Sequence, residues 1–359
     1  MKYALHKYWM KEFFKFFFII QLLILVLFVF IDYLSRLERF LNSEISLVGA
    51  AVYILLKVPY MFMQLTPASI LLSVITVFGL MNKNNELLAI RSSGISIYFL
   101  IRPALVAGFC LAGLMFFLGE TIIPVTMTKM YNIKHNIILK RHDLSAARED
   151  VWIKSGSRLV HINYFNPAQL TVGGVTITVL DDAFNLDQRI DAGKGRYVDG
   201  AWVFEDVIEQ IHETDDFNYD VKMYDRKVVD LDIQPEDLEA IAKKSEEMSF
   251  TELSRYISKI ESEGYDATTY RVDLYGKIAF PFICVIMILA GATTGMKSFV
   301  KENLPAGIAV GIVFAFLYWV MYGFCLSLGY GQILPPLVSS WVTNLFFLAF
   351  GTLYLLNTE

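Results

Sequence analysis

Charged residues at the edges of apolar runs are the side chains in this sequence whose types and spacing could do chemistry. Asp32 and Arg36 follow a long apolar run at an i, i+4 spacing, which places both on one helix face, and Arg39 follows them. A guanidinium presents forked donors that suit phosphate, so these residues could form a charged rim for an anionic, phosphate-bearing lipid. The alternative is an interfacial pair whose charged ends reach out to water.

A second basic group lies beyond a later apolar run. It contains Lys129, Lys134, His135, Lys140 and Arg141. A solvated helix end explains such a stretch, and a site for lipid phosphates at the outer leaflet boundary is the alternative. Lys129 and Lys134 are the candidate lipid contacts in this stretch.

A polar stretch at residues 82–94 lies between two apolar runs. Asn84 or Asn85 could cap a short helix there, and the glycine that closes the stretch could end it. Such a helix would lie along the membrane and present Glu86 and Arg91 to water. It could dock in a groove of a cytoplasmic ATPase, where a carboxylate fixes its register against a basic residue. The alternative is an ordinary polar loop.

Catalytic and metal-binding motifs are missing from the sequence. It contains no Gly-x-x-x-x-Gly-Lys-Ser/Thr phosphate loop, no His-Glu-x-x-His and no Gly-x-Ser-x-Gly. Its three cysteines, Cys110, Cys284 and Cys325, all fall in apolar runs, so the polar middle of the chain can hold neither a disulfide framework nor a cysteine metal site. We therefore expect a protein that is not an enzyme, with no metal, no directly bound cofactor and no nucleic-acid partner.

Six apolar runs must position these residues. They cover residues 13–34, 59–81, 97–118, 274–296, 306–328 and 336–356. At about 1.5 Å per residue each can cross a bilayer core, and the first resembles a retained span more than a cleaved signal. The second run already begins near residue 48. Lys57, Pro59 and Pro67 predict an interfacial helix through Lys57 and then a span that is kinked at Pro67.

Between the two sets of runs, residues 135–265 have a different pattern. Short segments rich in Val, Ile, Thr and aromatics alternate with turn signals, and they predict seven or more strands in a sandwich or jelly roll. Gly173 and Gly174 should break the third segment. Two amphipathic helices should follow, the first opening at Pro235 and the second with the capping-box pattern of residues 249–252.

Charge separates the two parts of the chain. Residues 135–269 hold 15 Lys and Arg and 27 Asp and Glu, a net of −12, which leaves a net of +7 for the rest. The N-terminus and two short loops are basic, whereas the loop at residues 329–336 has no charge. Those basic residues are Lys2, Lys7, Lys11, Lys15, Lys83, Arg91, Lys297 and Lys301. The positive-inside rule therefore predicts cytoplasmic termini and a β domain outside the cytoplasm.

Three stretches resemble the lipopolysaccharide export permeases of the LptF/LptG (YjgP/YjgQ) family. Phe30-Ile-Asp-Tyr-Leu34 resembles the end of the family's first helix, and residues 58–67 and 85–94 resemble its second span and coupling helix. Gly331-Gln-Ile-Leu-Pro-Pro336 resembles the turn before the last span. The first and last stretches fit the LptG branch better than the LptF branch. The resemblance covers the full length, with three spans, a periplasmic β-jelly roll and three spans.

The resemblance implies a permease subunit of an ABC transporter in the bacterial inner membrane. Such a subunit extracts lipopolysaccharide from the membrane and passes it to a periplasmic bridge. Its partners would be an LptF-like permease, a dimer of an LptB-like ATPase that uses the ATP, LptC and an LptA-type bridge. ATPase coupling would fall to Glu86, Arg91, Leu87 and Ile90. The family's LptG pattern has a lysine where this chain has Val29, while Arg36 and Arg39 fall near other basic positions of that helix end.

We therefore expect three parts: transmembrane helices 1–3 with a coupling helix at about 84–94 in residues 1–134, a periplasmic β-jelly-roll domain in 135–265, and transmembrane helices 4–6 in 266–359. Lipid would enter an apolar cavity between helices, gated by spans one and five. Two alternatives stay open at this point. The chain could be the LptF-like partner subunit, or a membrane-anchored receptor or assembly factor whose β domain binds protein.

Overall fold

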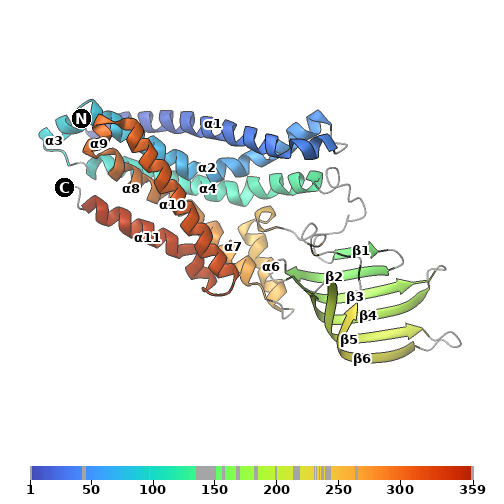
Figure 1. Cartoon of the computed structure of the whole chain (residues 1–359). Coiled ribbons are helices and arrows are strands. Elements are labelled where there is room, and N and C mark those ends of the chain that lie inside the picture. The colour runs from blue at the N-terminus through green and yellow to red at the C-terminus, as the bar shows by residue number, and fades with distance from the viewer. Residues whose placement is uncertain are drawn as a thin grey trace. The chain divides into compact units, whose positions relative to one another are not determined.

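The computed structural model describes residues 2–42, 46–96, 98–134, 151–155, 158–166, 170–181, 185–198, 200–212, 219–229, 231, 233, 235, 238, 244–262 and 266–356. The chain divides into two compact units. The first comprises Met1–Tyr131, Ser245–Ile257 and Ala267–Glu359, and the second comprises Asn132–Lys244 and Ser258–Asp266. The first unit is helical, and the second contains a β-sheet (Figure 1).

Long helices make up most of the first unit. The described helices are α1 (Lys2–Asn42), α2 (Leu47–Lys83), α3 (Glu86–Ser92), α4 (Tyr98–Ile133), the short η3 (Ser245–Glu247), α6 (Phe250–Ser262), α7 (Thr268–Ala279), η4 (Phe280–Phe282), α8 (Ile283–Gly295), α9 (Ser298–Glu302), α10 (Leu304–Tyr330) and α11 (Pro336–Leu356). Six helical stretches are long and apolar enough to cross a membrane, with α7, η4 and α8 forming one of them. The prediction of six spanning helices is confirmed.

The second span differs from the sequence prediction. We expected an interfacial helix that ends near Lys57, but α2 runs without a break from Leu47 to Lys83 and contains both Pro59 and Pro67. Each proline removes one backbone hydrogen bond. Packing against α1, α8 and α10 holds the helix together despite that loss, as it does for prolines in other membrane helices.

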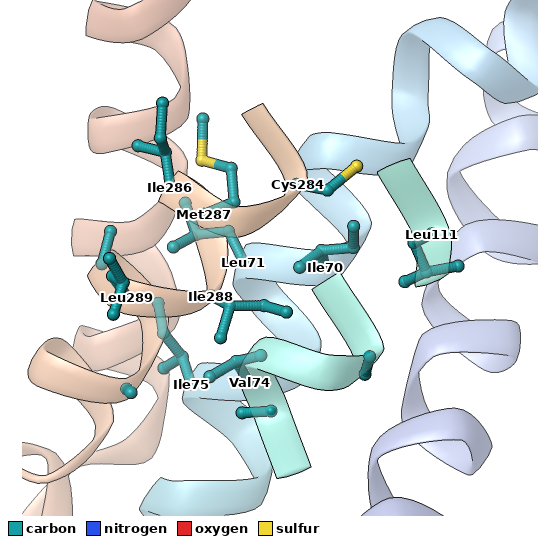
Figure 2. Packing of buried hydrophobic residues seen from close by; sticks show 14 of the residues in the cluster. Ile70, Leu71, Val74, Ile75, Leu111, Cys284, Ile286, Met287, Ile288 and Leu289 are labelled. Carbon is teal, nitrogen blue, oxygen red and sulfur yellow. The ribbon is translucent and has the colours of Figure 1, made fainter. Parts of the chain in front are cut away.

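The core of the helical unit lies between α2 and α8. Figure 2 shows Ile70, Leu71 and Val74 of α2 facing buried residues of α8. Glycines permit this approach, since a Cβ atom on Gly291 would lie 2.8 Å from Val74 Cβ and 3.0 Å from the Leu71 carbonyl oxygen. Close backbone contact of this kind is how helices associate in a membrane, where apolar burial gives no net drive.

The second unit contains one antiparallel sheet of six described strands. They are β1 (Val151–Ser155), β2 (Arg158–Asn166), β3 (Thr171–Leu180), β4 (Leu186–Val198), β5 (Ala201–His212) and β6 (Tyr219–Val229), and each pairs with the next in sequence order. The predicted inserted β domain is confirmed. The described strands form a meander, a simpler order than the crossed connections of a jelly roll. Two segments expected as separate strands, 188–192 and 195–198, are joined in β4.

The sheet has one buried face, whose residues alternate along the strands as expected for period-two burial. The Trp202 indole N–H donates to the Ile233 carbonyl at 2.9 Å and fixes this face to the chain that follows β6. Gly173 and Gly174 do not break β3, contrary to the prediction. Instead Gly174 has a φ of +58°, and a Cβ there would lie 2.5 Å from Asn163 Nδ2, so glycine lets the strand bend past its neighbour.

The trailing helices were predicted in part. The first, opening at Pro235, lies largely outside the described residues. The second is α6, and its predicted capping box is confirmed: the Ser249 N–H donates to Glu252 Oε2 at 2.9 Å, and the Glu252 N–H donates to Ser249 Oγ at 3.1 Å. Glu120 of α4 adds a further acceptor, because the Phe250 N–H donates to Glu120 Oε2 at 2.6 Å.

Candidate functional site

The predicted short helix is present as α3, which has seven residues. A helix of this length is unstable by itself, so its contacts must hold it in place. Leu87 is 4% exposed and belongs to the core of the helical unit, and the half-buried Ile90 packs against that core. Leu88 points outward and is 60% exposed. Of the four candidate coupling residues, Leu87 and Ile90 therefore anchor α3 in this structure, while the charged pair lies at the surface.

Glu86 is the first residue of α3, and Arg91 lies in its last turn. The helix dipole favours a carboxylate at the first position and a guanidinium at the last. The Tyr8 hydroxyl of α1 donates to the two Glu86 carboxylate oxygens at 3.4 and 3.3 Å, and Asn84 Nδ2 lies 3.5 Å from Oε1. Glu86 is half-buried and Arg91 is exposed. The carboxylate is thus oriented by the first helix, a contact that the sequence did not suggest.

The second group of candidates surrounds Asp32 near the other end of α1. Asp32 Oδ1 accepts hydrogen bonds from Arg36 Nε at 3.2 Å and from Lys57 Nζ of α2 at 2.7 Å. Arg36 also donates from Nη1 to the Tyr53 hydroxyl at 3.0 Å. The predicted pairing of Asp32 with Arg36 is thus seen, and α2 contributes Lys57 and Tyr53 to the same cluster.

Charge and burial in this cluster define what it can bind. Arg36 and Lys57 share one carboxylate, so the three charged groups retain a net positive charge. The Asp32 side chain is only 14% exposed, and its Oδ2 has no hydrogen-bond partner among the described residues. Asp32 therefore orders the two cations, and the cations provide donors suited to an anion. An isolated lysine in an apolar run needs a partner of opposite charge. The occurrence of a lysine in such a run is the sequence signal that could have identified Lys57.

Three lipid candidates remain, namely Arg39, Lys129 and Lys134. Arg39 lies in α1, but its side chain is outside the described residues. Lys129 is exposed in the last part of α4, and Lys134 follows the end of that helix. The hydrogen bonds of Asp32 and Arg36 described above join α1 to α2.

The two groups of candidates lie at opposite ends of α1. Tyr8 contacts Glu86 at one end, and Asp32 contacts Lys57 at the other. The 24 residues between Tyr8 and Asp32 correspond to about 36 Å of helix. A bilayer core is about 30 Å thick, so a membrane crossed by α1 would have the Glu86 group on one face and the Asp32 cluster on the other.

These features define a multi-pass membrane protein with an inserted β domain and with polar groups at both ends of its spanning helices. The family model described as lipopolysaccharide export system permease LptF/LptG matches residues 7–357, and the chain belongs to this family. The resemblance predicted from the three sequence stretches is confirmed.

Relatives share most of the length of the chain. The lipopolysaccharide export system permease protein LptG of Escherichia coli strain K12 is 23% identical over 321 residues, which are 86% of this chain and 86% of that protein. The protein of the same name from Haemophilus influenzae is 21% identical over 282 residues, which are 76% of this chain and 75% of the relative.

Proposed function

We propose that this chain is a permease subunit that extracts lipopolysaccharide from the inner membrane and passes it to a periplasmic bridge, driven by a separate ATPase. Family membership supports the transport role. The observation that carries the ATPase coupling is the placement of Glu86 on a short helix anchored through Leu87 and contacted by Tyr8 of α1. The relatives above are named LptG, which favours the LptG branch over an LptF-like subunit.

The proposed coupling acts through α3 as a rigid element. A groove on the ATPase would receive the exposed face of α3, with Glu86 fixing the register against a basic residue and Arg91 making a second contact. ATP is used by the ATPase, and this chain binds no cofactor in the proposal. Because Leu87 lies in the core, a displacement of α3 would move the membrane helices that Leu87 contacts.

The proposed lipid contacts lie at the Asp32 cluster. Arg36 and Lys57 would bind phosphate groups of the lipid, and Asp32 would hold both cations in place. The acyl chains would enter an apolar cavity gated by α1 and α10. Both helices expose many large apolar side chains, as expected for surfaces that meet lipid or a second permease of LptF type. LptC and an LptA-type bridge would receive the lipid on the β-domain side.

Reversal of the Glu86 charge tests the coupling. We expect a Glu86→Lys complex to lose the ATPase during purification in mild detergent, because two basic groups would then face each other. Glu302→Gln is the matched control, since Glu302 is an exposed carboxylate in the short helix α9. The control should keep the ATPase and release lipid normally. A Glu86→Lys complex that retains the ATPase and exports lipid at the wild-type rate would refute the assignment.

The periplasmic location of the β domain is tested by labelling. In a variant without the three native cysteines, a membrane-impermeant maleimide added to spheroplasts should label Lys194→Cys in β4, whose side chain is exposed. Leu88→Cys in α3 should react only after the membrane is opened. The reverse pattern would contradict the proposed orientation.

A further inference from the structure

We propose that Asn82, Asn85 and Lys301 are positioning residues. Asn82 ties the end of α2 to the junction of α8 and α9, and the contact of Asn85 with Lys301 ties the start of α3 to α9, so that movement of α3 passes through α9 to α10. This inference rests on the proposed function, in which α3 receives force from an ATPase. The three residues connect segments more than 200 positions apart in the sequence, since their contacts span 214 to 216 residues. The chain between α2 and α4 is thereby linked to the chain between α8 and α10.

Asn82 makes the first link. Its Nδ2 atom donates to the Met296 carbonyl at 3.2 Å and to the Lys297 carbonyl at 3.1 Å. Two carbonyl oxygens around one atom identify that atom as the amide nitrogen, since an amide oxygen cannot donate. Met296 is the C-cap of α8, and carbonyls at a helix end lack partners within the helix. The Asn82 amide therefore holds the end of α8 at the point where α2 ends.

Asn85 makes the second link at the start of α3. It has a φ of 60°, in the left-handed region that asparagine tolerates better than most residues. Contrary to the sequence prediction, its side chain does not cap α3. Its Oδ1 instead accepts a hydrogen bond from Lys301 Nζ in the last turn of α9 at 2.8 Å. The turn that places Glu86 is therefore attached to α9.

Close packing fixes α9 in turn between α2 and α10. Val300 of α9 is fully buried. A Cβ atom on Gly79 of α2 would lie 3.0 Å from Val300 Cγ1, and one on Gly307 of α10 would lie 2.8 Å from the same atom. With glycine on both sides, the valine leaves α9 no room to slide independently of either helix. A displacement of α3 is therefore transmitted through α9 to α10.

The Tyr8 contact adds a route to the other proposed gate helix. Because Tyr8 lies on α1 and donates to Glu86, α3 contacts span one directly. The same short helix thus reaches α1 through Glu86 and α10 through Asn85 and Lys301. A movement of α3 that displaces both helices at once would open or close the proposed gate in one step.

The test uses the complex of this chain with its partner permease and ATPase in proteoliposomes that contain lipopolysaccharide. Two variants each remove one link: Asn82→Asp, nearly isosteric but without the donor, and Lys301→Met. We expect both to keep the ATPase bound and hydrolysing ATP while the lipid released per ATP falls by about fivefold or more, the lower bound of typical coupling between sites. Lys301→Arg keeps a donor and should restore release, and Glu302→Gln should match wild type.

A double-mutant cycle separates coupling from a structural defect. Asn85→Gly removes the amide and tolerates the left-handed backbone, and both Asn85 and Lys301 are exposed, so these variants should fold. Asn85→Gly with Lys301→Met should lose no more release per ATP than either change alone. Wild-type release per ATP in Asn82→Asp and Lys301→Met would overturn this inference alone. A wild-type chain that fails to bind the ATPase would overturn the proposed function as well.

Discussion

Helices α1 and α2 lie side by side but are held in place by different means. The most apolar window of α1 has a mean hydropathy of 2.8 and is 11% buried, whereas that of α2 has a mean hydropathy of 1.8 and is 67% buried. The more apolar helix is thus the less buried one. In a membrane protein strong hydropathy indicates contact with lipid or another chain, and the packed centre is identified by small residues that let backbones approach.

Buried aromatic side chains in its first half and polar contacts along its length hold α1, whereas close backbone approach to α8 holds α2. The polar contacts of α1 include the Tyr8 hydroxyl with Glu86, Gln21 Nε2 with the Phe62 carbonyl at 3.1 Å, and Asp32 with Lys57. On α2, by contrast, Gly291 and Gly295 of α8 lie directly against its backbone and side chains. Polar contacts of this kind can break one at a time, as the proposed gate requires, whereas the interlocked α2 and α8 move together.

The largest effect should come from filling the interlocked centre. Gly291→Val would force new atoms against Val74 and the Leu71 carbonyl, neither of which is a flexible chain end. We expect a loss of about 3 kcal/mol or more in stability, measured as a lower thermal unfolding midpoint in detergent.

Gly323→Val is the control for that change, since a Cβ on Gly323 would meet no atom within 4 Å. It should alter the midpoint only slightly. Equal losses in the two variants would show that helix propensity, and not close packing, sets the stability of this centre.

An intermediate effect should follow from cutting one polar contact of α1. Lys57→Met removes a charged hydrogen bond to Asp32 and should loosen the end of α1 by about 1.5–3 kcal/mol. Hydrogen exchange over residues 30–38 would rise in the intact protein. Lys15→Met is the control, because Lys15 bonds Glu12 within α1 itself at 2.8 Å. If exchange near Asp32 stays at the wild-type rate in Lys57→Met, the contact does not hold the helix.

A smaller effect on stability, which depends on pH, is expected for the ion pair of Glu209 with Lys227 in the β-sheet. Glu209 is almost fully buried, and Lys227 Nζ lies 2.6 Å from its Oε2. Burial favours the neutral carboxyl, but hydrogen bonds from Lys227, Gln188 and Tyr224 outweigh it and lower the pKa of Glu209. The ionised Glu209 therefore stabilises the folded sheet at pH values above the pKa of about 4.3 that this carboxyl has in the unfolded chain. This stabilisation is lost as the pH falls through the lower pKa of the folded state.

Comparison with Glu209→Gln isolates this contribution. Amide exchange in β5 and β6 should be slower in wild type than in Glu209→Gln at pH 6, and the difference should shrink toward pH 3. A difference that stays constant over this range would mean that the carboxylate charge does not stabilise the sheet.

The sequence predicted the elements better than their contacts. Apolar runs revealed the six spans, and the reciprocal capping of Ser249 and Glu252 was visible as a local motif. Gly195 was expected to begin a separate strand, but it lies inside β4 and permits Phe204 to pack, since a Cβ there would lie 2.5 Å from that ring. Such packing depends on the three-dimensional fold, and the local sequence pattern does not reveal it.

The candidate sites were predicted only in part, for the same reason. Glu86 and Asp32 stood out as charges beside apolar runs. Their partners Tyr8 and Lys57, and the contact of Asn82 with the end of α8, join positions far apart in the chain. A single sequence cannot reveal such pairs. A polar residue in an apolar run indicates that a partner exists, but it does not identify that partner.

Charge reversal across the proposed ATPase contact tests the central claim most directly. Glu86→Arg should abolish ATPase binding and lipid release in the reconstituted complex, and replacing each basic residue of the ATPase groove in turn by glutamate should identify one change that restores both. Such rescue would establish α3 as the point where ATPase movement enters the permease. Wild-type binding and release by Glu86→Arg alone would contradict the account.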